Sequence, residues 1–245
     1  MGTLANKVGH SIWYLEAAVG ICSLVLALFL LIKKKTRSVP DLLILHLCIS
    51  ELMFVMWSIV NYSVSLLWHN SIQYRIYLAV QFLFGTANYL NMLSITIDRV
   101  LAVHSPLRYK ILVTKRKFYV SVCVIWTAAL LVGIACLAMS YKCFTTIFHF
   151  VLDPLSLLII LSGYVYIVLT VKMRNRTLRD KAATKPKIKF AIPFCILASF
   201  CCFILIPNLV LCSNFKLMSI WFQVIWYLNF IVDPLTYVVI TKLRK

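Results

Sequence analysis

Residues 11–37 read SIWYLEAAVGICSLVLALFLLIKKKTR, a long apolar run that ends at a cluster of basic residues. Residues 11–32 are enough to cross a bilayer as a helix, which takes about 20 mostly apolar residues. The residues before the run are polar and the run itself is long, so it does not resemble a cleavable signal peptide, and we expect a short, free N-terminus. Apolar runs followed by basic residues recur along the chain, and this pattern predicts a helical membrane protein.

The composition excludes a water-soluble domain. Hydrophobic residues make up 62% of the 245 residues, charged residues make up only 13%, and the mean hydropathy is +0.93. A soluble domain has roughly 25% charged residues, so lipid must solvate most of the outer face. The net charge of +18 would suggest nucleic acid in a soluble protein. Because the basic residues lie in short runs between apolar stretches, we expect the lipid bilayer and no nucleic acid as a partner.

Seven apolar runs are long enough to span a membrane. Strands of a membrane barrel would be about ten residues long with alternating polarity, so the run length predicts helices. We expect an all-α membrane protein, a seven-transmembrane helix bundle that forms a single domain over residues 1–245, because no repeat or second domain is visible. The predicted spans are 11–32, 41–67, 73–103, 118–140, 145–171, 188–211 and 218–241.

The basic residues predict the orientation, since cytosolic loops carry an excess of Lys and Arg. Most of the 25 Lys and Arg residues follow the first, third, fifth and seventh spans. The other side of the membrane holds only Lys7, Arg75, Lys142 and Lys216. We therefore expect the N-terminus outside and the C-terminus in the cytosol, which requires an odd number of spans.

Two acids, Glu51 and Asp233, lie well inside predicted spans. An ionised acid there costs about 2.5–3.5 kcal/mol even on lenient insertion scales. Every Lys and Arg is assigned to a loop or a helix end, so these acids must be protonated, share one proton or hold a cation. Asn88 and Asn229 are polar neighbours inside apolar runs. Two interpretations stay open: a neutral pair that only joins helices through hydrogen bonds, and an ion- or proton-linked site.

Short motifs occur in order along the predicted spans. An Asp-Arg pair at a membrane boundary can neutralise itself, and a shifted Asp proton would free the arginine. A proline near the end of a span opens the backbone ladder and produces a kink. The motifs are Leu47 with Glu51 in the second span, Asp98-Arg99-Val100 and Ser105 to Tyr109 at and after the end of the third, Trp126 in the fourth, Pro207 in the sixth and Asp233-Pro234-Leu235-Thr236-Tyr237 in the seventh.

Together these motifs resemble those of the rhodopsin-like (class A) G-protein-coupled receptors, over nearly the whole chain. The resemblance implies a plasma-membrane receptor that binds an extracellular ligand and activates a heterotrimeric G protein when the sixth span swings outward at Pro207. It implies that Leu107 docks into the G protein. Two tyrosines, Tyr237 and either Tyr164 or Tyr166, would close around the arginine in the active state. The implied switch residues are Asp98, Arg99, Leu107, Tyr164, Pro207 and Tyr237.

The same resemblance gives the intramembrane polar residues a role. They align with the sodium-binding pocket of the family, so a bound sodium ion is the one cofactor we expect. The seventh span holds no lysine before Lys242, which excludes a retinal Schiff base. The aligned residues are Glu51, Asn88, Asn229 and Asp233.

The outer halves of the third, fifth, sixth and seventh spans should form the ligand pocket. Gln81 stands where amine receptors carry an aspartate, so a biogenic amine is disfavoured. Asp153 is the strongest candidate, because an acid in the outer half of a span needs a reason. For every candidate, plain helix packing is an equal alternative. The candidate contacts are Gln81, Phe82, His149, Asp153, Gln223 and Tyr227.

The outer end of the third span departs from the family. Tyr74 and Arg75 stand there and no cysteine does, so the usual disulfide from this span to the second outer loop cannot form. Cys143 and Cys212 could pair across outer loops or remain two free thiols. The short second outer loop and the aspartate of the last motif are similar to the melanocortin, cannabinoid and adenosine branch, although the acids of melanocortin receptors are absent.

Two other functions stay open. A receptor-like protein that no longer signals could act as a membrane partner of other receptors, since Leu205 replaces the tryptophan of the sixth span. A small transporter would show inverted repeats or paired broken helices, and none is visible. We do not expect an enzyme, because the sequence has neither a His/Glu metal spacing nor a nucleophile elbow.

Overall fold

The computed structural model describes residues 2–65, 71–139, 144 and 153–179. The regular structure within these ranges is helical, which confirms the predicted all-α class for this part of the chain. The sixth and seventh predicted spans, 188–211 and 218–241, lie outside the described residues. The helices are α1 (Gly2–Lys33), α2 (Val39–Ser65), α3 (Ser71–His104), α4 (Tyr109–Leu112), α5 (Lys115–Ala138) and α7 (Asp153–Arg179).

The helix ends differ from the limits of the predicted spans, because polarity alone does not stop a helix. α1 begins at Gly2 instead of residue 11, so the polar residues expected to form a free N-terminus are helical. α7 continues to Arg179, beyond the expected end at residue 171. Hydropathy locates the part of a helix that crosses the membrane, whereas caps and backbone hydrogen bonds set its ends.

Among the described residues, three helices are long and apolar enough to cross a membrane, over Tyr14–Lys33, Val39–Val60 and Lys115–Ala138. α7 contains a shorter apolar stretch, Leu158–Met173. α3 is 34 residues long and more polar than these three helices. It packs against α2, α5 and α7, so its polar side chains can find protein partners, which lipid would not provide.

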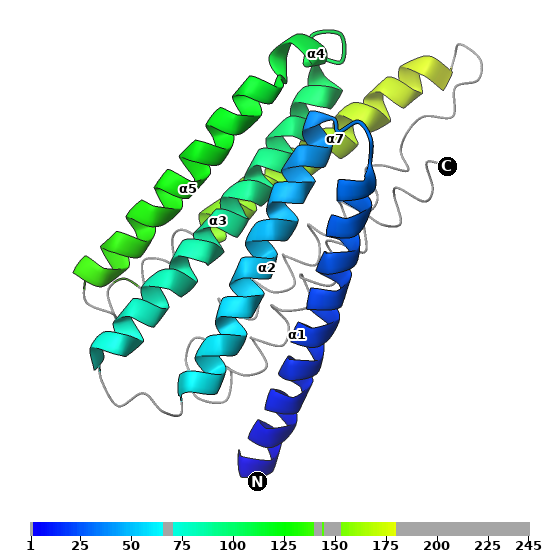
Figure 1. Ribbon diagram of the computed structural model, residues 1–245. Helices are drawn as coiled ribbons and strands as arrows, with labels where there is room; N and C mark the ends of the chain where they lie inside the picture. The colour runs from blue at the N-terminus through cyan, green and yellow to red at the C-terminus, as the bar shows by residue number, and fades with distance from the viewer. Residues whose placement is uncertain (1, 66–70, 140–143, 145–152, 180–245) are drawn as a thin grey trace.

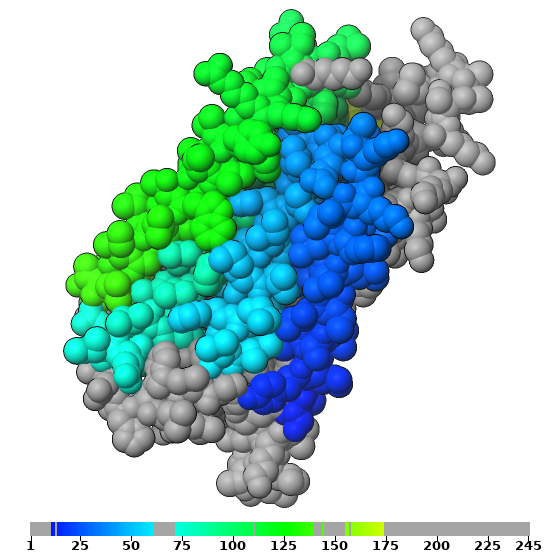
Figure 2. All heavy atoms as spheres, viewed as in Figure 1, coloured from blue at the N-terminus to red at the C-terminus, as the bar shows by residue number. Residues whose placement is uncertain are grey.

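The long helices lie side by side and alternate in direction (Figure 1). The connection from α1 to α2, the short α4 and the C-terminal end of α7 therefore lie at the same end of the molecule. Figure 2 shows α5, part of α3, α2 and α1 side by side on one face. Large apolar side chains remain exposed on α1 and α5, among them Phe29 and Leu131. Such exposure is what helices surrounded by lipid require.

Two glycines let α3 approach its neighbours closely. A Cβ atom added at Gly163 of α7 would lie 2.6 Å from Cγ2 of Thr96 in α3. One added at Gly133 of α5 would lie 3.2 Å from the carbonyl oxygen of Ala79 in α3. Helix association in a membrane depends on packing rather than on water exclusion, so small residues at such contacts determine how near two backbones come.

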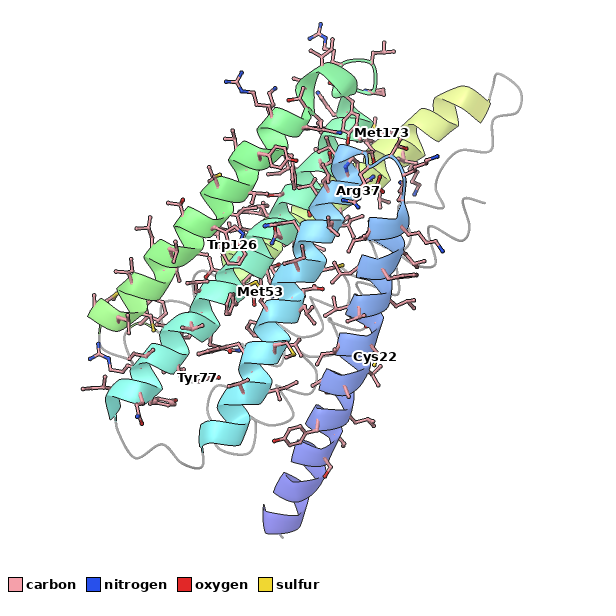
Figure 3. The ribbon with its side chains drawn as sticks, in the orientation of Figure 1. Cys22, Arg37, Met53, Tyr77, Trp126 and Met173 are labelled. Atoms are coloured by element: carbon pink, nitrogen blue, oxygen red, sulfur yellow. The ribbon has the colours of Figure 1, made fainter. Side chains whose placement is uncertain are left out.

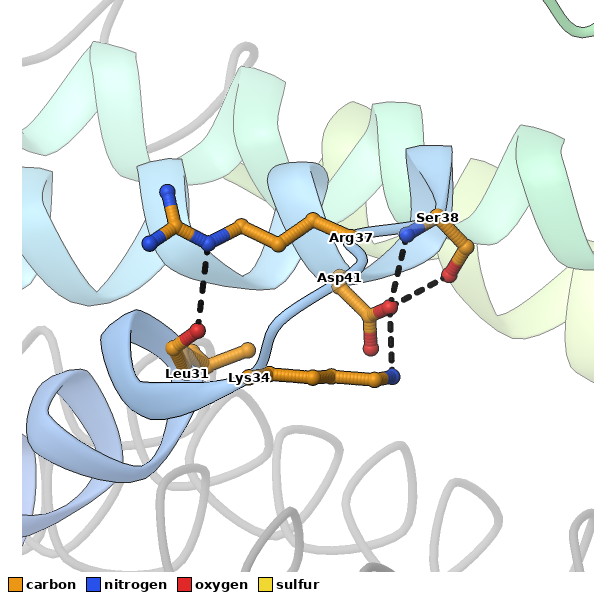
Figure 4. A network of polar contacts seen from close by, with 5 residues as sticks. All are labelled: Leu31, Lys34, Arg37, Ser38 and Asp41. Atoms are coloured by element: carbon orange, nitrogen blue, oxygen red, sulfur yellow. Dashed lines mark hydrogen bonds and ion pairs between the residues drawn. The ribbon is translucent and has the colours of Figure 1, made fainter.

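The connection between α1 and α2 is fixed by polar contacts (Figure 4). Arg37 donates to backbone carbonyls at the end of α1, including that of Leu31 at 3.2 Å, and so caps this helix. Asp41 accepts a hydrogen bond from the backbone N–H of Ser38 at 2.9 Å, as the acid of a capping box does at the start of a helix. Lys34 lies 2.6 Å from the same carboxylate oxygen. These contacts set the reversal of direction between the two helices.

We expect Gly163→Ala to lower the unfolding temperature of the purified protein in detergent, measured by circular dichroism. The new methyl group would overlap Thr96, whose buried hydroxyl donates to the Met92 carbonyl at 2.9 Å and so holds the side chain in place. Overpacking of this kind costs about 1–3 kcal/mol, which outweighs the gain of about 1 kcal/mol from the better helix propensity of alanine.

Gly85→Ala is the matched control. A Cβ atom there would lie 3.7 Å from Cε2 of Phe54, an ordinary contact, so this variant should unfold at the same temperature as the wild type or a higher one. Equal unfolding temperatures for the two alanine variants would contradict the close contact of α3 with α7.

Candidate functional site

Asp98 is buried near the end of α3, where its side chain is 4% exposed. The Tyr109 hydroxyl donates to its Oδ1 at 2.6 Å, and Nε of Arg99 lies 3.6 Å from its Oδ2. Tyr109 is the first residue of α4, so this bond folds the connection after α3 back onto the helix. Burial and, after it, the hydrogen bond to Asp98 raise the pKa of the Tyr109 phenol above its ordinary value. Tyr109 therefore remains a proton donor at physiological pH.

The connection that this bond holds presents apolar side chains to the surroundings. Leu107, just before α4, is 93% exposed, and Ile111 within α4 is 75% exposed. The backbone N–H of Leu112 donates to the Arg108 carbonyl at 2.9 Å and closes the short helix. Thr114 then caps the start of α5. This short connection therefore exposes two large apolar side chains.

The two tyrosines considered for the switch have different roles in the structure. Tyr164 of α7 is buried and belongs to an apolar cluster against which Val100, the residue after the Asp-Arg pair, packs. Tyr166 places its hydroxyl 2.6 Å from Nδ1 of His104, the last residue of α3. Both side chains thus join α7 to the end of α3 that carries the charged pair. The other two predicted switch residues, Pro207 and Tyr237, lie outside the described residues.

Glu51, the acid of the predicted ion pocket in α2, is 2% exposed. Its neighbour Ser50 accepts a hydrogen bond from Nδ2 of Asn91 at 3.0 Å, so α2 and α3 meet at this level. Asn88 lies one turn before Asn91, and its buried Oδ1 has no hydrogen-bond partner among the described residues. The described ranges contain no cluster of three or more His, Cys, Asp or Glu side chains suited to a metal. Asn229 and Asp233, the other predicted members, lie outside these ranges.

Two predicted ligand contacts, Gln81 and Phe82, also have partners within the protein. Nε2 of Gln81 donates to the Ser58 hydroxyl of α2 at 3.1 Å. The Phe82 ring meets the Phe144 ring edge-on, with 5.0 Å between the centroids. Asp153 is the first residue of α7. The remaining candidates, His149, Gln223 and Tyr227, lie outside the described residues.

A polar chain that the sequence did not predict links α2, α3 and α5. Trp126 lies on the side of α5 that faces α2 (Figure 3), and its Nε1 donates to Nε2 of His46 at 2.9 Å. Nδ1 of His46 lies 2.6 Å from Oδ1 of Asn91. Asn91 in turn donates to Ser50, whose hydroxyl donates to the Leu47 carbonyl at 2.9 Å.

This chain of hydrogen bonds fixes the protonation state of His46. The indole N–H of Trp126 can only donate, so Nε2 of His46 must be the unprotonated acceptor. The proton of the neutral imidazole then sits on Nδ1 and is donated to Asn91. Every hydrogen bond in the chain therefore points in one direction, from α5 to α2, then to α3 and back to α2. The three helices form one unit at the level of Glu51.

The sequence contains part of the information that predicts this chain of hydrogen bonds. His46 and Ser50 are four residues apart, so they lie on one face of α2, and each interrupts an apolar run. Asn91 interrupts the third predicted span in the same way. That pattern predicts a polar contact between helices, but it does not say which helix supplies the partner.

The described helices define a multi-pass helical membrane protein. Residues 22–142, just under half of the chain, match the model of the family described as 7 transmembrane receptor (rhodopsin family). The matched segment runs from α1 through α5. This part of the chain, which includes apolar helices long enough to cross a membrane, is therefore similar to that receptor family. A comparison with curated proteins found no match. The family model does not separate the melanocortin, cannabinoid and adenosine branch, so that interpretation stays a prediction.

We expect His46→Ala and Trp126→Phe each to reduce the free energy of unfolding by about 1–3 kcal/mol, because each leaves a buried polar group without its partner. The double variant should lose less than the sum of the two, since both residues contribute to one hydrogen bond. Thermal or denaturant unfolding of the four proteins in detergent measures this coupling.

Trp57→Phe is the matched control for Trp126→Phe. Nε1 of Trp57 has no hydrogen-bond partner among the described residues, so its loss should cost less than the loss of Nε1 in Trp126. Strict additivity of His46→Ala and Trp126→Phe, within about 0.5 kcal/mol, would contradict the bond between them.

Proposed function

We propose that the chain is a G-protein-coupled receptor of the plasma membrane that binds an extracellular ligand and activates a heterotrimeric G protein. In this proposal seven spans form one bundle over residues 1–245, with the N-terminus outside and the C-terminus in the cytosol. The observation that carries it is the arrangement at the end of α3. There Asp98 holds both Arg99 and Tyr109, and the connection tied down by Tyr109 exposes Leu107. The family match supports the same class.

The proposed switch works through the partners of Arg99. Its Nε lies 3.6 Å from Oδ2 of Asp98, and its side chain is 25% exposed. At 3.6 Å the two atoms are too far apart for a direct hydrogen bond, so a change of conformation can exchange this ion pair for other contacts. Agonist would favour a second state in which the sixth span swings outward at Pro207. Tyr164 and Tyr237 would then close around the arginine.

Leu107 is the proposed contact with the G protein. Burying a leucine side chain in an apolar groove contributes about 1.5–3 kcal/mol. Leu107 is exposed in this fold, so a partner that covers it would gain this free energy on binding. The hydrogen bond from Tyr109 to Asp98 joins the Leu107 connection to the charged pair. Docking at Leu107 and the state of Arg99 are therefore coupled through one carboxylate.

We propose that Glu51, Asn88, Asn229 and Asp233 hold a sodium ion between the helices. The sequence places every lysine and arginine in a loop or at a helix end, away from the two acids, and oxygen ligands suit a hard cation. The buried Oδ1 of Asn88, without a hydrogen-bond partner among the described residues, supports this use. A neutral pair of acids that only joins helices is the alternative.

The proposed ligand site lies in the outer halves of the bundle. Gln81 offers an amide that Ser58 already shares, so it supplies no charge to bind an ammonium group. We therefore expect no biogenic amine as the ligand. We also expect no retinal, because the seventh predicted span holds no lysine before Lys242. The proposed contacts are Gln81, Phe82, His149, Asp153, Gln223 and Tyr227.

We expect Leu107→Ala to lower the basal rate of guanine-nucleotide exchange on added heterotrimers by about tenfold, the loss typical of an interface hot spot. The unfolding temperature should not change, because an exposed side chain contributes little to stability. The assay uses the full chain in nanodiscs with a panel of heterotrimers. Ile97→Ala, which removes a 51% exposed side chain from α3 itself, is the matched control and should exchange at the wild-type rate.

The outcomes of this assay separate the competing functions. Exchange that depends on Leu107 supports the receptor. An absence of exchange with every heterotrimer would favour a receptor-like partner that does not signal. Movement of a solute into sealed proteoliposomes that contain the full chain, again without exchange, would favour a small transporter.

We expect sodium chloride to raise the unfolding temperature above that in choline chloride at the same ionic strength. An ion at ten times its Kd stabilises the folded state by about 1.4 kcal/mol. Glu51→Gln should abolish the difference between the two salts, because it removes the charge that attracts the cation. Glu16→Gln changes an acid of α1, a different helix from that of Glu51, and should keep the difference. A sodium effect that survives Glu51→Gln would rule out the proposed pocket.

A further inference from the structure

Arg75 of α3 binds the end of α5. Its Nη2 donates to the carbonyl oxygen of Leu137 and also lies 3.3 Å from that of Met139. α5 ends at Ala138, so these carbonyls belong to its last turn and its C-cap. The final carbonyls of a helix have no donor within the helix. A cation placed there also interacts favourably with the negative end of the helix dipole.

Close packing of α3 and α5 brings Arg75 within reach of these carbonyls. A Cβ atom added at Gly133 would lie 3.2 Å from the carbonyl oxygen of Ala79. Ala79 lies one turn after Arg75, and Gly133 lies one turn before Leu137, so the two contacts are successive turns of one antiparallel pair. The glycine contact therefore sets the distance at which the guanidinium group can bridge the helices.

We infer that Arg75 is the tie that fixes this end of α3 to the end of α5. The neighbouring Tyr74 stands where the rhodopsin-like receptors carry the cysteine of their outer disulfide, and α3 contains no cysteine from which such a bond could form. The tie in this chain consists of charge-assisted hydrogen bonds to backbone carbonyls, so it does not depend on redox conditions. This role of Arg75 is structural and holds whether or not the chain signals.

Two buried cysteines can report on the tie. Cys136 is free, 4% exposed and packed with Ala79 and Phe82, next to the carbonyl that Arg75 binds. Cys48 of α2 is also buried and is 2% exposed. Local opening between α3 and the end of α5 would expose Cys136 alone, whereas global unfolding would expose both thiols.

The experiment measures the rate at which N-ethylmaleimide labels each thiol in the full chain in nanodiscs, with peptides resolved by mass spectrometry. We expect Arg75→Ala to raise the rate at Cys136 about tenfold, as the loss of a charged hydrogen bond predicts, and to leave Cys48 unchanged. Arg75→Lys keeps the charge but loses the guanidinium fork, so its rise should be smaller. Gln73→Ala, exposed at the same end of α3, is the matched control.

Treatment of the wild type with a reductant, removed before labelling, should leave the rate at Cys136 unchanged. A faster rate after reduction would mean that a disulfide, such as one between Cys143 and Cys212, holds this end instead, and would overturn the inference. A change of less than about twofold in Arg75→Ala, the scatter of ordinary surface substitutions, would overturn it as well. So would a parallel rise at Cys48 in both Arg75 variants, which would make Arg75 a support of the whole fold.

Discussion

The hydrocarbon core of a bilayer offers no hydrogen-bond partners, and this constraint governs how the helices of this chain pack. A polar side chain within the bundle must find its partner on another helix or in a connection. α3 lies against three other helices and receives most of these contacts. Near one end Asp98 binds Tyr109, and near the other Gln81 binds Ser58. Between them, His46 binds Asn91. The polar pairs specify which faces of the helices meet, and apolar packing fills the space around them.

The helices could be predicted because the length and apolar character of a run are properties of a single segment. Their ends could not, since α1 starts at Gly2 among polar residues and α7 runs on to Arg179. The short α4 was also missed. Four residues carry no periodicity, and the first residue of this helix, Tyr109, is held by a hydrogen bond to Asp98 of α3. Local structure that depends on a tertiary contact cannot be predicted from the residues of that segment alone.

Some polar contacts of the structure could likewise be predicted from the sequence, and others could not. Asp98 and Arg99 are neighbours in sequence, so their pairing needs no knowledge of the fold. Trp126 and His46 are 80 positions apart, and their contact depends on the rotation of α5 against α2. The sequence analysis counted Arg75 among the few basic residues on the outer side of the membrane. Its partners are backbone carbonyls, and because every residue has one, the sequence does not reveal which of them Arg75 binds. Hydrophobicity predicts the depth of a residue in the membrane, whereas the register between helices decides its partner.

The length of α7 has a mechanical consequence. Its apolar stretch ends at Met173, but the helix continues to Arg179. At the rise of an α-helix, the added residues extend it by about 9 Å. A continuous helix is stiff over such a distance, so a small tilt where it leaves the bilayer becomes a larger sideways displacement at its tip. Arg179, the last described residue of α7, is therefore the part of this helix that such a tilt would displace most.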